Sequence, residues 1–128
     1  MSDVEFEVPA LAEYVSLVRM VVSSLAASRR EIDDELLDDL RVAVSEACTL
    51  AVGDDPERRL TVTCREEPGS FVVDVAPLEV APAGGGGIDP FSIDPLSLLG
   101  ALVDGVETVT VGDTAILRLR VACAAVDA

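Results

Sequence analysis

The spacing of apolar residues switches between a strand-like and a helix-like period along this chain, and the switch limits the fold. Val4, Phe6 and Val8 alternate with glutamates up to Pro9, which predicts a half-buried first strand. Helical spacing follows, and alternation returns at Leu60. A chain that places helices and alternating strands in this order is expected to fold as a layer of helices over a sheet.

Two long segments have helical spacing. The first covers residues 11–27, with Leu17 and Met20 on the side away from its main apolar stripe. The second covers residues 34–52, where Asp33 offers an N-terminal cap. The predicted core stripe of the second helix consists of Leu36, Leu40, Ala43, Val44, Ala47 and Ala51.

Two pairs of alternating segments predict hairpins. Residues 60–65 and 71–75 are joined by a Pro68-Gly69 turn, and residues 108–111 and 114–122 by Gly112-Asp113. A short helix over residues 95–103 precedes the second hairpin. We therefore predict an α+β fold: a two-layer α/β sandwich with a mixed, mainly antiparallel sheet and about three helices on one face.

A single domain over residues 1–128 is expected, because a chain of this length supports one sizeable core. Within it, residues 76–94 hold three prolines and the four consecutive glycines 84–87. We expect this segment to be flexible, because it is too long and too rich in glycine for an ordinary connection. A phosphate-binding loop is the less favoured alternative, because no Lys-Ser or Lys-Thr follows the glycines.

Composition excludes several functional classes. The net charge of −15, with arginine as the only basic residue type, would repel nucleic acid, so no direct nucleic-acid binding is expected. Absence of histidine excludes histidine-dependent hydrolase and zinc chemistry, and no metal site is predicted.

Cys48, Cys64 and Cys123 lie in apolar patterns and are expected to stay reduced. No apolar run is long enough for a membrane span and no signal peptide is seen, so we expect no membrane association and a cytoplasmic location.

Glu46 is the candidate site residue on the second helix. Helical spacing places Val42, Glu46 and Leu50 one above another, so hydrocarbon flanks the carboxylate on both sides. Two interpretations stay open: an ordinary exposed carboxylate, or a residue that lines a pocket.

Residues 39–49, which read Asp-Leu-Arg-Val-Ala-Val-Ser-Glu-Ala-Cys-Thr, follow Pro9 and an arginine-bearing helix. Together with residues 102–107 and Gly112-Asp113-Thr114, they resemble the anti-sigma serine kinases of the RsbW type, in the GHKL (Bergerat-fold) ATPases. The resemblance covers most of the chain. It implies a GHKL-like domain in which residues 76–94 are the remnant of an ATP lid.

The resemblance also implies roles for named positions in nucleotide chemistry. Glu46 matches the glutamate that activates the attacking hydroxyl, and if the chain is a kinase, backbone amides near Pro95 and Thr114 would hold the phosphates. The family's magnesium-binding asparagine, one turn after the glutamate, is replaced by Leu50. Asp94-Pro95 stands where a Gly-x-Gly would receive phosphates, and residues 76–79 lack the adenine-binding aspartate.

No basic residue lies between Arg65 and Arg118, so a triphosphate would find no fixed counter-charge in that stretch. We therefore expect weakened or lost nucleotide binding, no cofactor, and impaired or absent kinase activity. ATP and magnesium are expected only under the alternative, an active ATP-dependent serine protein kinase with Glu46 as base.

Arg19 carries over from the family as the arginine that contacts a sigma factor or the anti-sigma antagonist. The predicted partner surface consists of Arg19, Met20, Ser16 and Ser23. Ordinary exposed surface is the competing interpretation. The predicted function is an anti-sigma-factor-like regulator that acts by protein binding in a partner-switching pathway. The two-faced apolar helix also suggests a homodimer, and a scaffold without any sigma partner is a third hypothesis.

Overall fold

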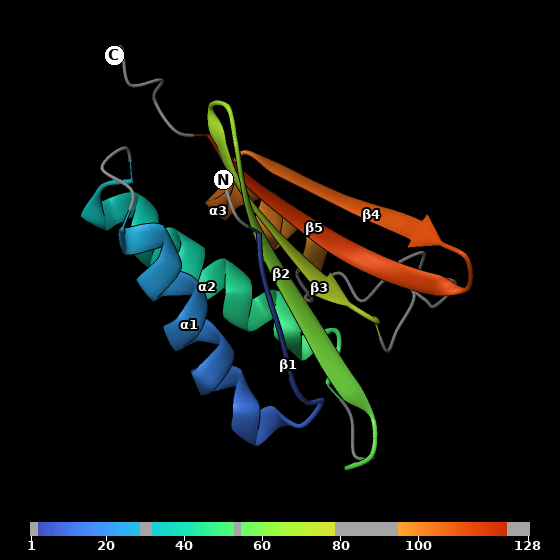
Figure 1. Cartoon of the computed structure of the whole chain (residues 1–128). Coiled ribbons are helices and arrows are strands. Elements are labelled where there is room, and N and C mark those ends of the chain that lie inside the picture. Colours follow the sequence, from blue (N-terminus) through green and yellow to red (C-terminus); the bar gives the residue numbers. More distant parts are fainter. Residues whose placement is uncertain (1–2, 29–31, 53–54, 79–94, 123–128) are drawn as a thin grey trace, which may run out of the picture.

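The computed structural model describes residues 3–28, 32–52, 55–78 and 95–122 of the chain (Figure 1). The elements follow the predicted order of strand, two helices, two strands, helix and two strands. Their bounds are β1 (Val4–Pro9), a 3-10 turn η1 (Ala12–Tyr14), α1 (Val15–Ala27), α2 (Asp34–Thr49), β2 (Arg59–Glu67), β3 (Ser70–Ala76), α3 (Pro95–Leu102), β4 (Gly105–Val111) and β5 (Thr114–Ala122).

The five strands form one sheet in the order β1-β2-β3-β5-β4. Every pair of neighbouring strands in the described chain is antiparallel, so the prediction of a mixed sheet is wrong in this respect. Two of the four pairs are hairpins, whose short turns permit only antiparallel pairing. Gly69 (φ 76°) and Gly112 (φ 62°) supply the left-handed backbone that these turns require.

The three helices cover one face of the sheet, as predicted, and no helix of the described residues covers the opposite face, which we call the open face (Figure 1). Helix α2 lies between α1 and α3 and contacts both. Every second side chain of a strand points towards the helices. Leu60, Leu117 and Leu119 are such side chains and are fully buried in the core. The two-layer α+β prediction is therefore confirmed.

Helix α2 buries a broader face than the predicted stripe. Leu40, Ala43, Val44 and Ala47 are buried as expected, but Leu36 is only partly buried. Leu37 and Cys48 take core positions that the predicted stripe omitted. The reason is that α2 is flanked by helices on both sides and therefore buries a broader face than a single stripe.

The ends of the two long helices are fixed by specific hydrogen bonds. Asp33 accepts a bond from the Leu36 amide at 2.8 Å, which confirms the predicted cap. Helix α2 ends at Thr49, three residues before the predicted end, and Leu50 is its C-cap. The Arg58 guanidinium donates to the carbonyl oxygens of Ala51 and of Pro77, and so ties the end of α2 to the end of β3.

The remaining differences concern boundaries. The predicted first helix begins with η1 before α1, and β4 begins at Gly105 rather than at residue 108. Of the predicted flexible segment, residues 79–94 lie outside the described residues. In the described chain, no helix combines the length and the apolar character that a membrane crossing needs.

Candidate functional site

Arg19 lies on α1 where that helix faces α2. Its Nη1 donates to Ser45 Oγ at 3.2 Å and its Nη2 to Ser16 Oγ at 3.5 Å. Both acceptors are neutral hydroxyls, and Arg19 makes no ion pair with any residue in the described part of the chain. The guanidinium is thus held at the surface across two helices while its charge stays uncompensated.

A groove of about 520 Å³ opens beside this guanidinium, between α1 and α2. Arg41 and Asp38 face each other in it at 2.9 Å, and both are exposed. The groove is lined by Arg19, Asp38, Arg41, Val42 and Ser45. Of these five residues, only Arg19 belonged to the predicted partner surface, because the other four come from α2 and join it only when α2 packs against α1.

Three exposed large apolar side chains belong to the same two helices. Met20 is 61% exposed, Val42 49% and Leu17 43%. Only Val111 of β4 joins them as an exposed large hydrophobic side chain in the described residues. Exposed apolar side chains on elements that also present charged groups are typical of protein-binding sites.

One member of the predicted partner surface is misplaced. Ser23 is only 7% exposed, and its hydroxyl donates to the carbonyl oxygens of Arg19 (2.6 Å) and Met20 (3.2 Å). A mid-helix serine commonly bonds the preceding turn in this way. Ser23 is therefore corrected from a partner contact to a structural residue, whereas Ser16, Arg19 and Met20 are exposed.

Glu46 is half-buried on α2, and its carboxylate makes no hydrogen bond or ion pair with a described residue. Val42, Glu46 and Leu50 lie one above another on α2, and exposure falls along them: Val42 is half exposed, whereas Leu50 packs against the core cluster. A leucine side chain has no oxygen for a hard cation such as magnesium. No group of three or more metal-binding side chains occurs in the described residues, and position 50 does not fit a magnesium-bridged nucleotide.

Thr114 does not join Glu46 in one site. Its register partner is Val111, and it alternates with the buried Leu117 and Leu119, which puts its side chain on the open face of the sheet. Glu46 lies in the helical layer on the other face. The side chains of Thr114 and Glu46 thus lie on opposite faces of the sheet, and their joint role in nucleotide binding stays a prediction.

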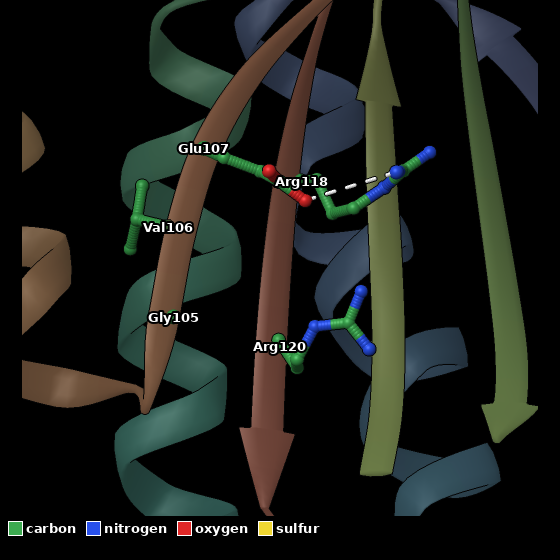
Figure 2. Close-up of a pocket in the computed structure, with 5 residues that line it drawn as sticks. All are labelled: Gly105, Val106, Glu107, Arg118 and Arg120. Atoms are coloured by element: carbon green, nitrogen blue, oxygen red, sulfur yellow. Dashed lines mark ion pairs between the residues drawn. The ribbon is translucent and has the colours of Figure 1, made fainter.

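The open face of the sheet carries a network of arginines and carboxylates. Asp74, which is 8% exposed, accepts from Arg118 Nε at 2.8 Å and Nη2 at 3.0 Å. Arg65 Nη1 lies 3.2 Å from the same carboxylate, and Arg120 donates to Glu67 at 2.7 Å. Figure 2 shows Arg118 and Arg120 in front of the strands, with the helices behind. Val72 is fully buried beneath this network, where its register partners are Arg65 and Arg120.

These contacts stabilise the charged forms of the groups involved. The hydrogen bond from Arg120 lowers the pKa of Glu67, and the hydrogen bond to Asp74 raises the pKa of Arg118. A shallow hollow of about 220 Å³ remains between Glu107, Arg118 and Arg120, at the position where Gly105 has no side chain (Figure 2). Counting charges along the sequence missed this neutralisation, because Arg65 and Arg118 reach the intervening acids across the strands.

The two described cysteines are poor nucleophiles. Cys48 and Cys64 are buried free thiols, as predicted, and burial raises the pKa of each to about 12. The third, Cys123, lies outside the described residues. Neither described thiol is suited to nucleophilic chemistry.

Comparisons with known proteins agree with this architecture. A family model described as "Histidine kinase-like ATPase domain" matches residues 8–90. The "Serine-protein kinase RsbW" of Bacillus subtilis is 47% identical over 49 residues, which cover 38% of this chain and 30% of that protein. The protein of the same name from Bacillus pumilus is 34% identical over 85 residues, which cover 53% of this chain and 52% of the relative. The matches thus span between about a third and a half of these relatives.

A crystal structure of the RsbU and RsbW domains of a Mycobacterium tuberculosis protein matches with a TM-score of 0.71 at 15% identity. The match covers 96% of this chain and 33% of that one. At this identity the likeness supports the fold.

Proposed function

The chain belongs to the histidine kinase-like ATPase domain family, and from this premise we propose that it is a regulatory protein of the RsbW-like anti-sigma type that works by binding other proteins. Its partners are a sigma factor, an anti-sigma antagonist, or both in turn. Sequestration is the mechanism: α1 holds one partner, and a competitor displaces it from an overlapping surface.

The observation that carries this proposal is the exposed position of Arg19 beside Met20 on α1. Two serine hydroxyls orient the arginine, and no carboxylate among the described residues pairs with it. Arginine and methionine are both enriched in protein interfaces, since each covers apolar area and the guanidinium adds directed hydrogen bonds. The Arg19 guanidinium is therefore already oriented at the surface before a partner binds.

Affinity capture from cells of the source organism tests the binding function. Wild-type protein is expected to retain a sigma factor or its antagonist, identified by mass spectrometry, and Arg19→Ala is expected to lower the recovery roughly tenfold or more. Arg59→Ala is the matched control, because Arg59 is also an exposed surface arginine but lies on β2 in a pair with Glu7. Recovery of neither partner class, or equal recovery by Arg19→Ala, would refute the proposal.

We further propose that nucleotide binding and kinase chemistry are lost in this chain. Leu50 packs against the core where the family's magnesium-binding asparagine would stand, and the apolar area that it buries stabilises the fold. Without a metal-bound phosphate in place, a hydroxyl activated by Glu46 would have no phosphate to attack. The cytoplasmic location and the homodimer stay predictions.

Calorimetric titration with ATP and magnesium tests this loss. Wild-type protein is expected to show no magnesium-dependent binding up to about millimolar ATP, which corresponds to less than roughly 4 kcal/mol of binding free energy. Leu50→Asn restores an oxygen ligand, and a gain of magnesium-dependent binding in that variant would identify position 50 as the missing contact. Tight binding by wild type, with phosphate transfer abolished in Glu46→Gln, would establish the kinase alternative instead.

A further inference from the structure

We propose that the outer edge of β4 is a docking site for an extended segment of another protein, which adds to the sheet as a strand antiparallel to β4. The segment places an aromatic side chain opposite Gly105 and a lysine or arginine opposite Glu107. β-Branched side chains lie opposite Val109 and Val111. This edge is at the far side of the sheet from β1 and β2, near which α1 packs, so the proposal does not depend on the proposed function.

Strand β4 is an edge strand, and no strand of the described residues pairs with its outer side (Figure 1). In antiparallel pairing, every second residue of an edge strand directs its amide and carbonyl away from the neighbouring strand. These groups can bond to an added strand, which is a common way to bind an extended peptide. Thr108, Thr110 and Val111 are exposed, so the helical layer does not shield this part of the strand.

The two edges of the sheet differ in how well they resist strand addition. Strand β1 reads Val-Glu-Phe-Glu-Val-Pro, and charged side chains and proline are the residues that protect natural sheet edges. Strand β4 reads Gly-Val-Glu-Thr-Val-Thr-Val, with one charge, no proline, and valine or threonine at five of its seven positions. Valine and threonine both favour strands. Of these two edges, β4 is therefore the one suited to accept a partner strand.

The hollow at Gly105 provides a seat for one large side chain of the added strand. It has a volume of about 220 Å³, and Figure 2 shows Arg118 and Arg120 beside the position where Gly105 has no side chain. In sheets, an aromatic side chain opposite a glycine can lie across that glycine and cover it. Here the ring would also meet the two guanidiniums, which are attracted to aromatic faces. An aromatic residue is thus the side chain that this hollow favours.

The charge next to the hollow calls for a basic residue two positions away. Glu107 is 56% exposed, and its ion-pair partner Arg118 lies 3.7 Å from it. Arg118 already binds Asp74 through two hydrogen bonds of 2.8 and 3.0 Å, so Glu107 is only weakly compensated. An opposite charge directly across the strands is stabilising, and the net charge of −15 attracts basic segments. Further along β4, β-branched side chains would cover Val111, which is 61% exposed.

A second copy of β4 fits this edge less well than a different segment does. Two β4 strands paired antiparallel over their full length, with Thr108 at the centre, would place Val111 opposite Gly105. The same pairing would place Val109 opposite Glu107. Valine is too small to cover the hollow as an aromatic ring does, and it offers no positive charge to the carboxylate. The hollow and the carboxylate therefore both favour a foreign strand.

The test uses a synthetic peptide with the core Val-Thr-Val-Thr-Lys-Thr-Tyr, titrated into the isotope-labelled full chain and followed by NMR shifts of backbone amides. A second peptide has alanine in place of the tyrosine. Two further peptides carry backbone N-methyl groups, one at the valines, lysine and tyrosine and the other at the threonines between them. Only one of these two sets can direct its amides towards β4, so each methylated peptide is the matched control of the other.

The tyrosine peptide is expected to shift the amides of residues 105–111 and to leave those of residues 4–9 unchanged. One methylated peptide is expected to lose binding and the other to keep it. The alanine peptide is expected to bind roughly fivefold more weakly or worse. Gly105→Val fills the hollow and is expected to weaken the tyrosine peptide by a similar factor. Gly100→Val, on α3, is the control and is expected to stay within about twofold, because a Cβ at Gly100 meets only open space.

A charge exchange keeps the test decisive if Gly105→Val does not fold. A peptide with glutamate in place of the lysine is expected to bind at least about fivefold more weakly to wild type, and Glu107→Lys is expected to restore its binding. Arg19→Ala is expected to bind the tyrosine peptide like wild type, which separates this edge from the surface of the proposed function.

Several results would overturn the proposal: main shifts outside residues 105–111, equal binding of the tyrosine and alanine peptides, equal behaviour of the two methylated peptides, or no restoration by Glu107→Lys. Shifts of the β4 amides that grow with protein concentration in the absence of peptide would assign the edge to a second copy, and would also overturn it.

Discussion

Replacing Phe71 by alanine is expected to lower the free energy of unfolding by about 3–5 kcal/mol. Phe71 is 1% exposed and is the largest fully buried side chain in the described chain. The chain has only three phenylalanines, one tyrosine and no tryptophan, so few other side chains could expand into the cavity. Since domains of this kind are stable by about 5–15 kcal/mol, the variant would lose a large part of its stability.

Urea unfolding followed by circular dichroism measures this effect, with an unchanged slope against urea as the sign that only stability has changed. Phe6→Ala is the matched control: the same atoms are removed from edge strand β1, where Phe6 is only partly buried. We expect it to lose less than half as much. A loss below about 1 kcal/mol in Phe71→Ala would contradict the position of Phe71 in the core.

Most of the fold could be predicted from local spacing, because each element has a clear hydrophobic period. The N-cap Asp33 and the turn glycines Gly69 and Gly112 fell where the sequence placed them. Errors arose where a neighbour decides the outcome. Leu37 replaced Leu36 in the core because helices flank α2 on both sides, a fact that no spacing rule contains.

The candidate site was less accessible to sequence reasoning. Arg19 could be selected from the family resemblance, but Arg41 and Val42 become its neighbours only through the packing of α1 on α2. Ser23 looked equivalent to Ser16 in the sequence, yet the helix turns its hydroxyl towards its own backbone. The stretch between Arg65 and Arg118 has no basic residue in the sequence, but antiparallel pairing places Asp74, within that stretch, opposite Arg118.

Removal of that carboxylate is the second large effect. Asp74→Ala is expected to destabilise the fold by about 2–4 kcal/mol, because the Arg118 and Arg65 side chains, 23% and 25% exposed, lose their nearest carboxylate and keep only Glu107 and Glu67 at 3.7 Å. The value stays below that of a fully buried pair because water still reaches both arginines. Thermal unfolding and urea titration at pH 7 would measure it.

A double-mutant cycle separates lost attraction from stranded charge. If the loss in Asp74→Ala comes from the uncompensated arginines, then adding Arg118→Met should cost less than the two single changes together, since methionine keeps the volume and removes one stranded charge. Glu7→Ala is the control, because its pair with Arg59 is about half exposed on both sides and should be worth less than about 1 kcal/mol. Strict additivity of Asp74→Ala and Arg118→Met would show that these two residues of the open-face network do not act as a unit.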